Sequence, residues 1–224
     1  MGVRVNLSFM KKHPFFPERI VHIPSKRIFD VFFSLSALIL LSPLYLLIAL
    51  VIFFSTGSSP FFSQKRVGRG GKLFTCYKFR TMVPDAEKKL KELLASREDL
   101  RKEWEERHKL LHDPRVTYIG QFLRKTSLDE LPQFWNVLKG DLSVVGPRAV
   151  VMEEIEQQFK EKAQHILTIR PGITGLWQVN GRSLTTYQER IDLDERYVNS
   201  RHLILDLKIV FKTVPVMFKS RGAA

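Results

Sequence analysis

The chain has 224 residues, which is enough for one domain of ordinary size with a buried core but too short for two large soluble domains. Its formal net charge of +13 and isoelectric point near 10.0 predict an anionic partner. That partner could be nucleic acid, anionic lipid headgroups or phosphorylated small molecules. The single cysteine, Cys76, excludes an internal disulfide framework and a zinc site built on clustered cysteines.

The N-terminal quarter of the chain contains one long apolar segment. Residues 1–25 mix basic and aromatic side chains with three prolines, and we interpret them as an irregular leader without chemistry. The uncharged run Val31–Phe54 follows, about 24 residues in length, which as a straight helix would be long enough to cross a bilayer core. A cleaved signal peptide is disfavoured, because the run starts too far from Met1 and is longer than the apolar part of such a peptide.

Two interpretations of the apolar run remain. Ser42-Pro43 lies near its middle, and basic residues flank both of its ends. Proline removes a backbone donor and bends a helix, while a serine hydroxyl can bond a freed carbonyl group. The pair could therefore return the chain to the side on which it entered, and the positive-inside rule would then place both flanks in the cytoplasm. A kinked helix that spans the bilayer is the alternative.

A β-hairpin is predicted next. Phe61–Val67 has the composition of a short strand, Gly68–Gly71 that of a tight turn, and Lys72–Arg80 alternates basic with apolar residues as a returning strand does. The lysines of such a strand are usually solvated, although the same alternation could present Lys78 and Arg80 to a phosphate.

From Asp85 to Leu111 the sequence is highly charged, with Glu-Lys pairs at helical spacing, and predicts a long solvated helix or a helix pair.

The adjacent carboxylates Asp129 and Glu130 are the principal candidates for chemistry. We expect them at the start of a helix with Ser127 or Thr126 as its N-cap, which would by itself explain Glu130 as part of a capping box. The cap does not require Asp129 or the neighbouring Arg124, however. Carboxylates at such a position are suited to share Mg²⁺ with pyrophosphate oxygens.

Three later segments add features that fit a phosphate-binding protein at a membrane. Residues 170–175 and 178–182 are glycine-punctuated turns with an arginine each, and such turns allow backbone amides to approach an anion. Leu203–Phe218 has the pattern of a basic amphipathic helix, which would suit a helix in the membrane interface or one packed on the core.

Taken together, these motifs resemble a known family, the monotopic polyprenyl-phosphate phosphoglycosyl transferases, also called bacterial sugar transferases. The resemblance covers residues 26–221 and rests on the following segments in order: KRIFDVFF, the Ser-Pro pair, YKFRTM, RKTSLDELPQFWNVLKGDLSVVGPR, RPGITGLWQVNGR and LDLKIVFKT. It implies an enzyme that moves a sugar 1-phosphate from a UDP-sugar to a polyprenyl phosphate such as undecaprenyl phosphate. The products would be UMP and a polyprenyl-diphosphate sugar, in the first membrane step of surface glycan assembly, as in exopolysaccharide or lipopolysaccharide O-antigen synthesis.

The resemblance also implies the fold class, a mainly helical α+β protein. Residues 26–56 would form a re-entrant membrane helix hairpin broken at Ser42-Pro43. Residues 57–224 would form a small cytosolic catalytic domain with a short β-hairpin and interfacial amphipathic helices. The expected location is the bacterial inner membrane, with the catalytic domain on its cytoplasmic face.

The roles of individual residues follow from the same resemblance. Asp129 would be the nucleophile that forms a phosphosugar enzyme, and Glu130 would bind Mg²⁺ with Asp129 or help to deprotonate the acceptor phosphate. Arg124 and Arg148 would hold phosphate. The remaining substrate-binding candidates are Lys78, Arg80, Pro147, Arg170, Gly172, Gln178, Arg182 and Asp194.

Substrate and partners follow in outline only. The charged insertion between Met82 and Val116 resembles the catalytic part of larger hexose-1-phosphate transferases, which favours galactose or glucose as the donor sugar, but it could equally provide homodimer contacts. The expected partners are a UDP-sugar, a polyprenyl phosphate and membrane lipids, with Mg²⁺ as cofactor and no nucleic acid. The alternatives are a membrane-tethered protein whose basic face binds nucleic acid or anionic lipid, and a magnesium-dependent phosphodiester hydrolase that uses the same carboxylates on water.

Overall fold

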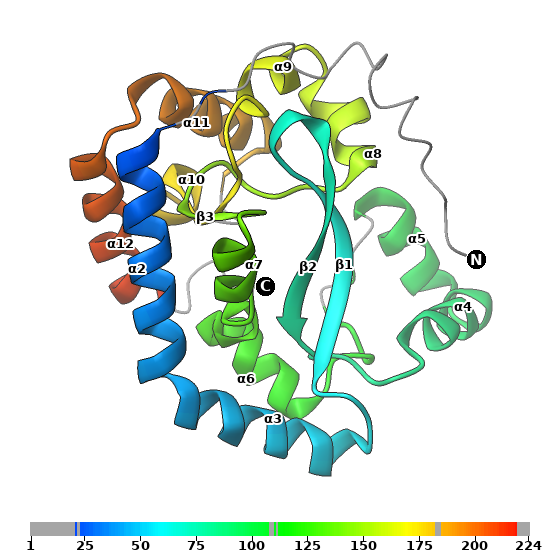
Figure 1. Ribbon diagram of the computed structural model, residues 1–224. Coiled ribbons are helices and arrows are strands. Elements are labelled where there is room, and N and C mark those ends of the chain that lie inside the picture. Colours follow the sequence, from blue (N-terminus) through cyan, green and yellow to red (C-terminus); the bar gives the residue numbers. More distant parts are fainter. Residues whose placement is uncertain (1–20, 22, 108–109, 111, 182–184, 219–224) are drawn as a thin grey trace.

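The computed structural model describes residues 21, 23–107, 110, 112–181 and 185–218. This part of the chain is mainly helical with two small two-stranded sheets, which confirms the predicted α+β class (Figure 1). The helices are α2 (Pro24–Leu40), α3 (Ser42–Thr56), α4 (Ala86–Ser96), α5 (Glu98–Arg107), α6 (Tyr118–Thr126), α7 (Gln133–Lys139), α8 (Met152–Glu154), α9 (Lys162–Ile166), α10 (Leu176–Val179), α11 (Tyr187–Ser200) and α12 (Leu203–Phe218). The strands and short helical turns are β1 (Phe61–Val67), β2 (Leu73–Phe79), β3 (Ser143–Val145), β4 (Gly172–Thr174), η1 (Arg69–Gly71), η2 (Leu128–Glu130) and η3 (Ile155–Phe159).

Helices α2 and α3 form a bent pair along one edge of the molecule (Figure 1). Among the described helices none is long and apolar enough to cross a membrane alone, whereas α2 and α3 together meet both criteria and are bent by 61°. Pro43 lies in the first turn of α3, and the Ser42 hydroxyl donates to the Ile39 carbonyl over 2.8 Å. The predicted break at Ser42-Pro43 is therefore confirmed, and its physical cause is the missing proline donor with serine bonding the preceding turn.

Most of α3 is apolar and exposed, but its inner face is fixed to the rest of the protein. Ile48 and Ile52 are buried against Leu123 of α6, whereas the large side chains of Leu46 and Phe54 are exposed. The Tyr45 hydroxyl donates to the carbonyl of Leu131.

The predicted hairpin is present. β1 and β2 pair antiparallel in a register that places Phe61 opposite Phe79 and Val67 opposite Leu73. The turn between them contains two glycines with left-handed backbone angles, Gly70 at φ 69° and Gly71 at φ 76°, which a residue with a side chain rarely adopts.

The second sheet corrects one expectation. Residues 172–174 form strand β4, parallel to β3, and are not the loop turn that the glycines suggested. The two backbones approach so closely that a Cβ atom on Gly172 would lie 2.0 Å from the Gly146 nitrogen. The glycine thus serves strand packing, a need that a single sequence does not distinguish from an anion-binding turn.

A second correction concerns the carboxylate segment. Ser127 is the C-cap of α6, in the left-handed conformation at φ 57°, and Thr126 is the last residue of that helix. Asp129 and Glu130 lie on the following 3-10 turn, η2, so neither Ser127 nor Thr126 caps a helix that carries them. The capping-box explanation of Glu130 is therefore wrong.

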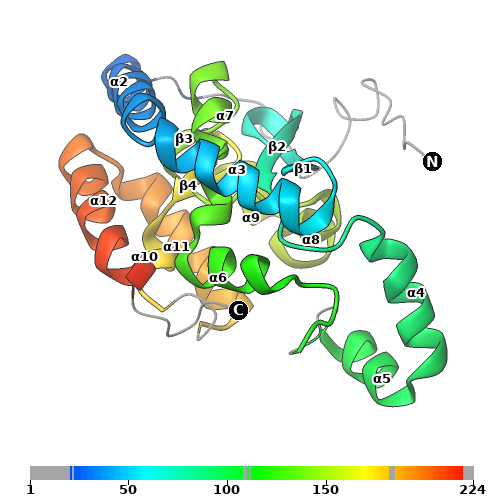
Figure 2. The same ribbon diagram turned by 90° about the horizontal axis from the view of Figure 1, so that it is seen from below.

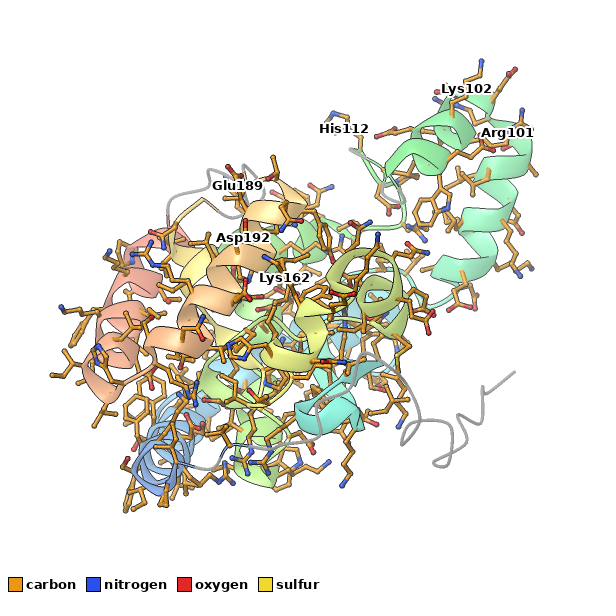
Figure 3. The ribbon with its side chains drawn as sticks, turned by 90° about the horizontal axis from the view of Figure 1, so that it is seen from above. Arg101, Lys102, His112, Lys162, Glu189 and Asp192 are labelled. Carbon is orange, nitrogen blue, oxygen red and sulfur yellow. The ribbon has the colours of Figure 1, made fainter. Side chains whose placement is uncertain are left out.

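The charged segment forms a helix pair, as predicted. In Figure 2, α4 and α5 stand apart from the body of the protein, and none of the α4 residues is buried. Figure 3 shows Arg101 and Lys102 on this outlying pair, far from Lys162 and Asp192, which form an ion pair between α9 and α11 over 2.6 Å.

Helix α12 has two faces. Asp206 and Ile209 are buried against the core, whereas Leu207 and Phe211 are exposed. Asp206 accepts hydrogen bonds from the Lys26 ammonium over 2.8 Å and from the Tyr197 hydroxyl over 2.7 Å. The expected packing of this helix on the core is therefore confirmed, whereas its place in a membrane interface stays a prediction, for which the exposed apolar face is available.

Candidate active site

The carboxylates of η2 share one ammonium group from strand β2. The Lys78 Nζ atom lies 2.6 Å from Glu130 Oε1 and 3.8 Å from Asp129 Oδ2. Asp129 is 9% exposed, and the side chains of Lys78 and Glu130 are each about three-tenths exposed. The hairpin register fixes this contact, because Lys78 lies one residue from the paired end of β2.

The two carboxyl groups differ in their titration. Burial, followed by the charge of Glu130, raises the pKa of Asp129 to about 6, although Lys78 and Arg124 act in the opposite direction. Burial would also raise the pKa of Glu130, but the charge and hydrogen bond of Lys78 outweigh it and lower that pKa, with help from Arg148. Asp129 therefore keeps the greater basicity of the pair, and a shift of this kind is typical of functional sites.

Arg124 is held beside the pair by the end of α6. Its Nε atom donates to the Thr81 hydroxyl over 3.0 Å, and its charge is one of the influences that lower the Asp129 pKa. This position depends on a glycine, because α6 packs so tightly on residue 81 that a Cβ on Gly120 would lie 2.0 Å from the Thr81 carbonyl oxygen.

These groups line a cavity of about 1290 Å³ that has both cationic and apolar lining residues. The cationic ones, here called the cationic wall, are Arg66, Lys78, Arg80, Arg124, Arg148 and Arg190. Those called the apolar wall belong to or flank α2, α7 and α12 and are Phe33, Ala37, Leu41, Leu131, Phe134, Val210 and Val214. The N-terminal half of α4 adds Glu87, Lys88 and Lys91 to the lining. A cavity of this construction can hold a polyanion beside an apolar chain.

A second group of cations lies around an indole ring. The guanidinium carbons of Arg148 and Arg190 lie 5.2 Å and 5.1 Å from the centre of the Trp177 ring. Arg66 approaches the same region and donates to Glu154 over 3.4 Å. Guanidinium groups on aromatic faces keep their donors free for anions while their charge is partly stabilised.

The cavity brings together most of the residues that the sequence predicted for the site. Those that line it are Asp129, Glu130, Lys78, Arg80, Arg124, Arg148 and Gln178. The Arg80 guanidinium group also donates hydrogen bonds to the backbone carbonyls of Ser59 and Phe61. Arg182 lies outside the described residues.

Four predicted residues lie elsewhere. Arg170 donates to the Gly140 carbonyl over 2.7 Å, outside the cavity lining, and the Pro147 carbonyl accepts from the Gly172 amide over 2.7 Å. Asp194 is 1% exposed, and its carboxylate accepts from the backbone amide of Arg148 over 3.2 Å. Burial raises the pKa of Asp194 to about 7. Pro147, Gly172 and Asp194 support the loop that carries Arg148, and none of the four residues lines the cavity.

Sequence reasoning missed Arg66, Thr81, Trp177 and Arg190 as parts of the site. Trp177 lies inside a motif that was singled out, directly before Gln178, so its position was a usable signal. Arg190 stands on α11 in an ordinary charged stretch, and only the packing of α11 on α10 brings it to Trp177.

Metal binding within the described residues would depend on few protein ligands. No group of three or more His, Cys, Asp or Glu side chains there could hold a metal ion. Asp129 and Glu130 supply two carboxylates with hard oxygen donors, so an ion at this site would need further oxygen atoms from a bound ligand.

Comparison with known proteins gives the family. A family model described as bacterial sugar transferase matches residues 21–220. The chain belongs to this family. The exopolysaccharide production protein ExoY of Sinorhizobium fredii is 47% identical over 199 residues, which are 89% of this chain and 88% of that protein.

Two larger relatives are similar over the same region. The undecaprenyl-phosphate galactose phosphotransferase of Salmonella typhimurium is 47% identical over 198 residues, which are 88% of this chain and 41% of that protein. The UDP-glucose:undecaprenyl-phosphate glucose-1-phosphate transferase of Klebsiella pneumoniae is 38% identical over 210 residues, which are 91% of this chain and 42% of that protein. This bacterial sugar transferase thus corresponds to most of ExoY and to less than half of the two phosphotransferases.

Proposed function

We propose that this protein transfers a sugar 1-phosphate from a UDP-sugar to a polyprenyl phosphate, giving a polyprenyl-diphosphate sugar and UMP. The observation that carries the proposal is the Asp129–Glu130 pair, with Asp129 buried, in a cavity lined by both cationic and apolar side chains. The cationic wall suits a diphosphate, and the apolar wall suits a lipid chain. The names of the relatives in Salmonella and Klebsiella, which act on undecaprenyl phosphate, support the same reaction.

Asp129 is the proposed nucleophile. Its carboxylate oxygen forms a bond to the phosphorus that carries the sugar, and the bond from this phosphorus to the bridging oxygen breaks, so that UMP leaves with the electron pair. The acceptor phosphate then attacks the same phosphorus and releases Asp129. Lys78 and Arg124 neutralise charge on the transferred phosphate. The covalent intermediate on Asp129 divides a displacement between two polyanions into two easier steps.

Mg²⁺ is the proposed cofactor, held by Asp129 and Glu130. Two carboxylates fit the way Mg²⁺ is bound at phosphoryl-transfer sites, where phosphate oxygens and water supply further ligands. Bound there, the ion would neutralise charge on the phosphate oxygens. Glu130 also accepts a hydrogen bond from Lys78.

The apolar wall indicates how the acceptor reaches the site. Phe33 comes from α2 and Val214 from α12, and Leu41 lies between α2 and α3. All three helices also present exposed apolar side chains. We place α2 and α3 in the bilayer as a re-entrant pair, with the catalytic domain on the cytoplasmic face of the bacterial inner membrane. A polyprenyl chain could then enter the cavity directly from the lipid, between α2 and α12.

The test is UMP release by the detergent-solubilised protein with Mg²⁺, across a panel of UDP-sugars that includes UDP-galactose and UDP-glucose. We expect sustained release with one sugar and only when undecaprenyl phosphate is present. Chelation of Mg²⁺ should abolish it. Sustained release into water without the lipid would contradict the transferase and favour a hydrolase.

Asp129→Asn supplies the decisive variant, because it removes the nucleophile and changes the shape very little. Turnover should fall by about a thousandfold or more, while UDP-sugar binding remains. Asp192→Asn is the matched control, since Asp192 is exposed on α11 and contacts Lys162 outside the cavity. Equal activity of Asp129→Asn and wild type would refute the assignment.

A further inference from the structure

The group of arginines around Trp177 carries more positive charge than its surroundings balance. Arg66 has Glu154 as a partner, but no carboxylate of the described residues lies within ion-pair distance of Arg148 or Arg190. Burial, and then the like charge of Arg148, lower the pKa of both Arg66 and Arg190. Arginine nevertheless stays protonated in proteins, so these groups repel one another without an anion between them.

Trp177 adds a second, independent indication of a ligand. The residue is 6% exposed and lines the cavity, yet its indole N–H has no hydrogen-bond acceptor among the described residues. A buried donor without an acceptor is uncommon and costly. An anion beside Trp177 would supply the acceptor and balance the guanidinium groups.

Arg148 lies at the Trp177 end of the cavity. Its guanidinium group is against the Trp177 ring, and it lines the same cavity as Asp129 and Glu130. The cavity thus has cations both at the Asp129 end, from Lys78 and Arg124, and at the Trp177 end. A diphosphate would place one phosphorus atom at each end. The phosphorus that carries the sugar must approach Asp129, and the other must lie beyond it, at the Trp177 end.

We propose that Arg190 binds the phosphate of the leaving UMP and neutralises the charge that builds on it when the diphosphate bond breaks. The inference rests on the proposed function and adds a catalytic residue to it. As Asp129 bonds to the sugar-bearing phosphorus, the electron pair of the broken bond stays on the bridging oxygen of UMP. Lys78 and Arg124 serve the transferred phosphate, whereas Arg190 and the Trp177 N–H serve the departing one.

The experiment measures UMP affinity of the solubilised protein by calorimetry. Arg190→Gln should weaken UMP binding roughly ten- to a hundredfold, the loss expected for one charged hydrogen-bonded contact. Arg190→Lys keeps a point charge without the planar fork and should fall between wild type and Arg190→Gln. Arg196→Gln, exposed on the same helix, is the matched control and should bind UMP as wild type does.

Two outcomes would overturn the inference. One is unchanged UMP affinity in Arg190→Gln, and the other is an equal loss of UMP affinity in Arg196→Gln. Should Arg190→Gln fail to fold, Arg190→Lys decides by the same measurement. The proposed function is judged separately, because a wild-type enzyme that turns over while Arg190 variants bind UMP normally would refute only the role of Arg190.

Discussion

As the proposed nucleophile, Asp129 must be ionised to react, so its raised pKa predicts a pH dependence. The pKa is about 6, and the rate of UMP release should therefore fall as the pH drops through 6, by roughly tenfold per unit below it. Because Lys78 lowers this pKa, Lys78→Met should shift the acid limb of the pH–rate profile to higher pH. A profile that is flat between pH 5 and 8 would contradict the assignment.

The same shift has a consequence for stability. The pKa of Asp129 is higher in the folded protein than its ordinary value of 3.8, so the folded state binds this proton more strongly than the unfolded state. The favourable contribution is complete below pH 4 and is lost as the pH rises through 6. Asp129→Asn should accordingly have a higher melting temperature than wild type at pH 8 and an equal one at pH 4, which thermal unfolding at the two pH values would check.

At the scale of elements, the packing of β3 on β4 explains why Gly172 is a glycine. A Cβ there would collide with the Gly146 backbone, which precedes Pro147 and Arg148. Gly172→Ala should therefore lower the melting temperature by several degrees and weaken donor binding only through displacement of Arg148. A variant of normal stability with weak donor binding would instead favour a direct contact between Gly172 and substrate.

The ion pair between α2 and α12 should stabilise the protein through its burial. Lys26 and Asp206 are 2.8 Å apart, with side chains 15% and 1% exposed. Removing one partner leaves a buried charge unpaired, which costs about 3–5 kcal/mol. Lys26→Met should therefore lower the melting temperature by roughly 6–20 °C. Lys26→Met combined with Asp206→Asn should lose less than the two single variants together. Additive losses would show that the pair is not coupled.

The sequence predicts those elements whose signal is local. The β1–β2 hairpin, the break at Ser42-Pro43 and the charged helix pair all follow from turn residues, proline chemistry and helical spacing. Ser127 was misassigned because serine suits a helix N-cap, while its left-handed C-cap conformation is set by how α6 meets η2. Strand β4 was missed because its three residues pair with β3 and, at Gly172, with Arg148, and such long-range contacts leave no periodic pattern.

At the scale of the whole molecule, the α4–α5 pair should be the least protected part of the fold. None of the α4 residues is buried, and the pair stands apart from the body (Figure 2). Its backbone amides should exchange with deuterium much faster than those of α11, which buries Ile191 and Tyr197. Mass spectrometry of exchanged peptides would show this, and equal protection of the two regions would indicate a partner on α4 and α5.

The site was predictable where its chemistry is concentrated in one motif. Asp129, Glu130 and Arg124 are close in sequence and were found, and Lys78 was found through its alternating strand. Arg190 joins them only through the packing of α11 on α10, and the apolar wall joins helices from both ends of the chain. Contacts between residues so far apart in sequence depend on the tertiary fold. The sequence alone therefore does not distinguish Arg190 from other arginines as part of the site.

The two walls of the cavity have a kinetic consequence. The donor dissolves in water, whereas an acceptor that enters between α2 and α12 diffuses in two dimensions within the lipid. Its effective concentration is then its mole fraction in the membrane or detergent micelle, and adding inert detergent at constant total acceptor should slow the enzyme by surface dilution. Adding buffer at a fixed detergent-to-acceptor ratio would dilute only the donor. Rates for this enzyme are therefore comparable only when the lipid phase is specified as carefully as the solution.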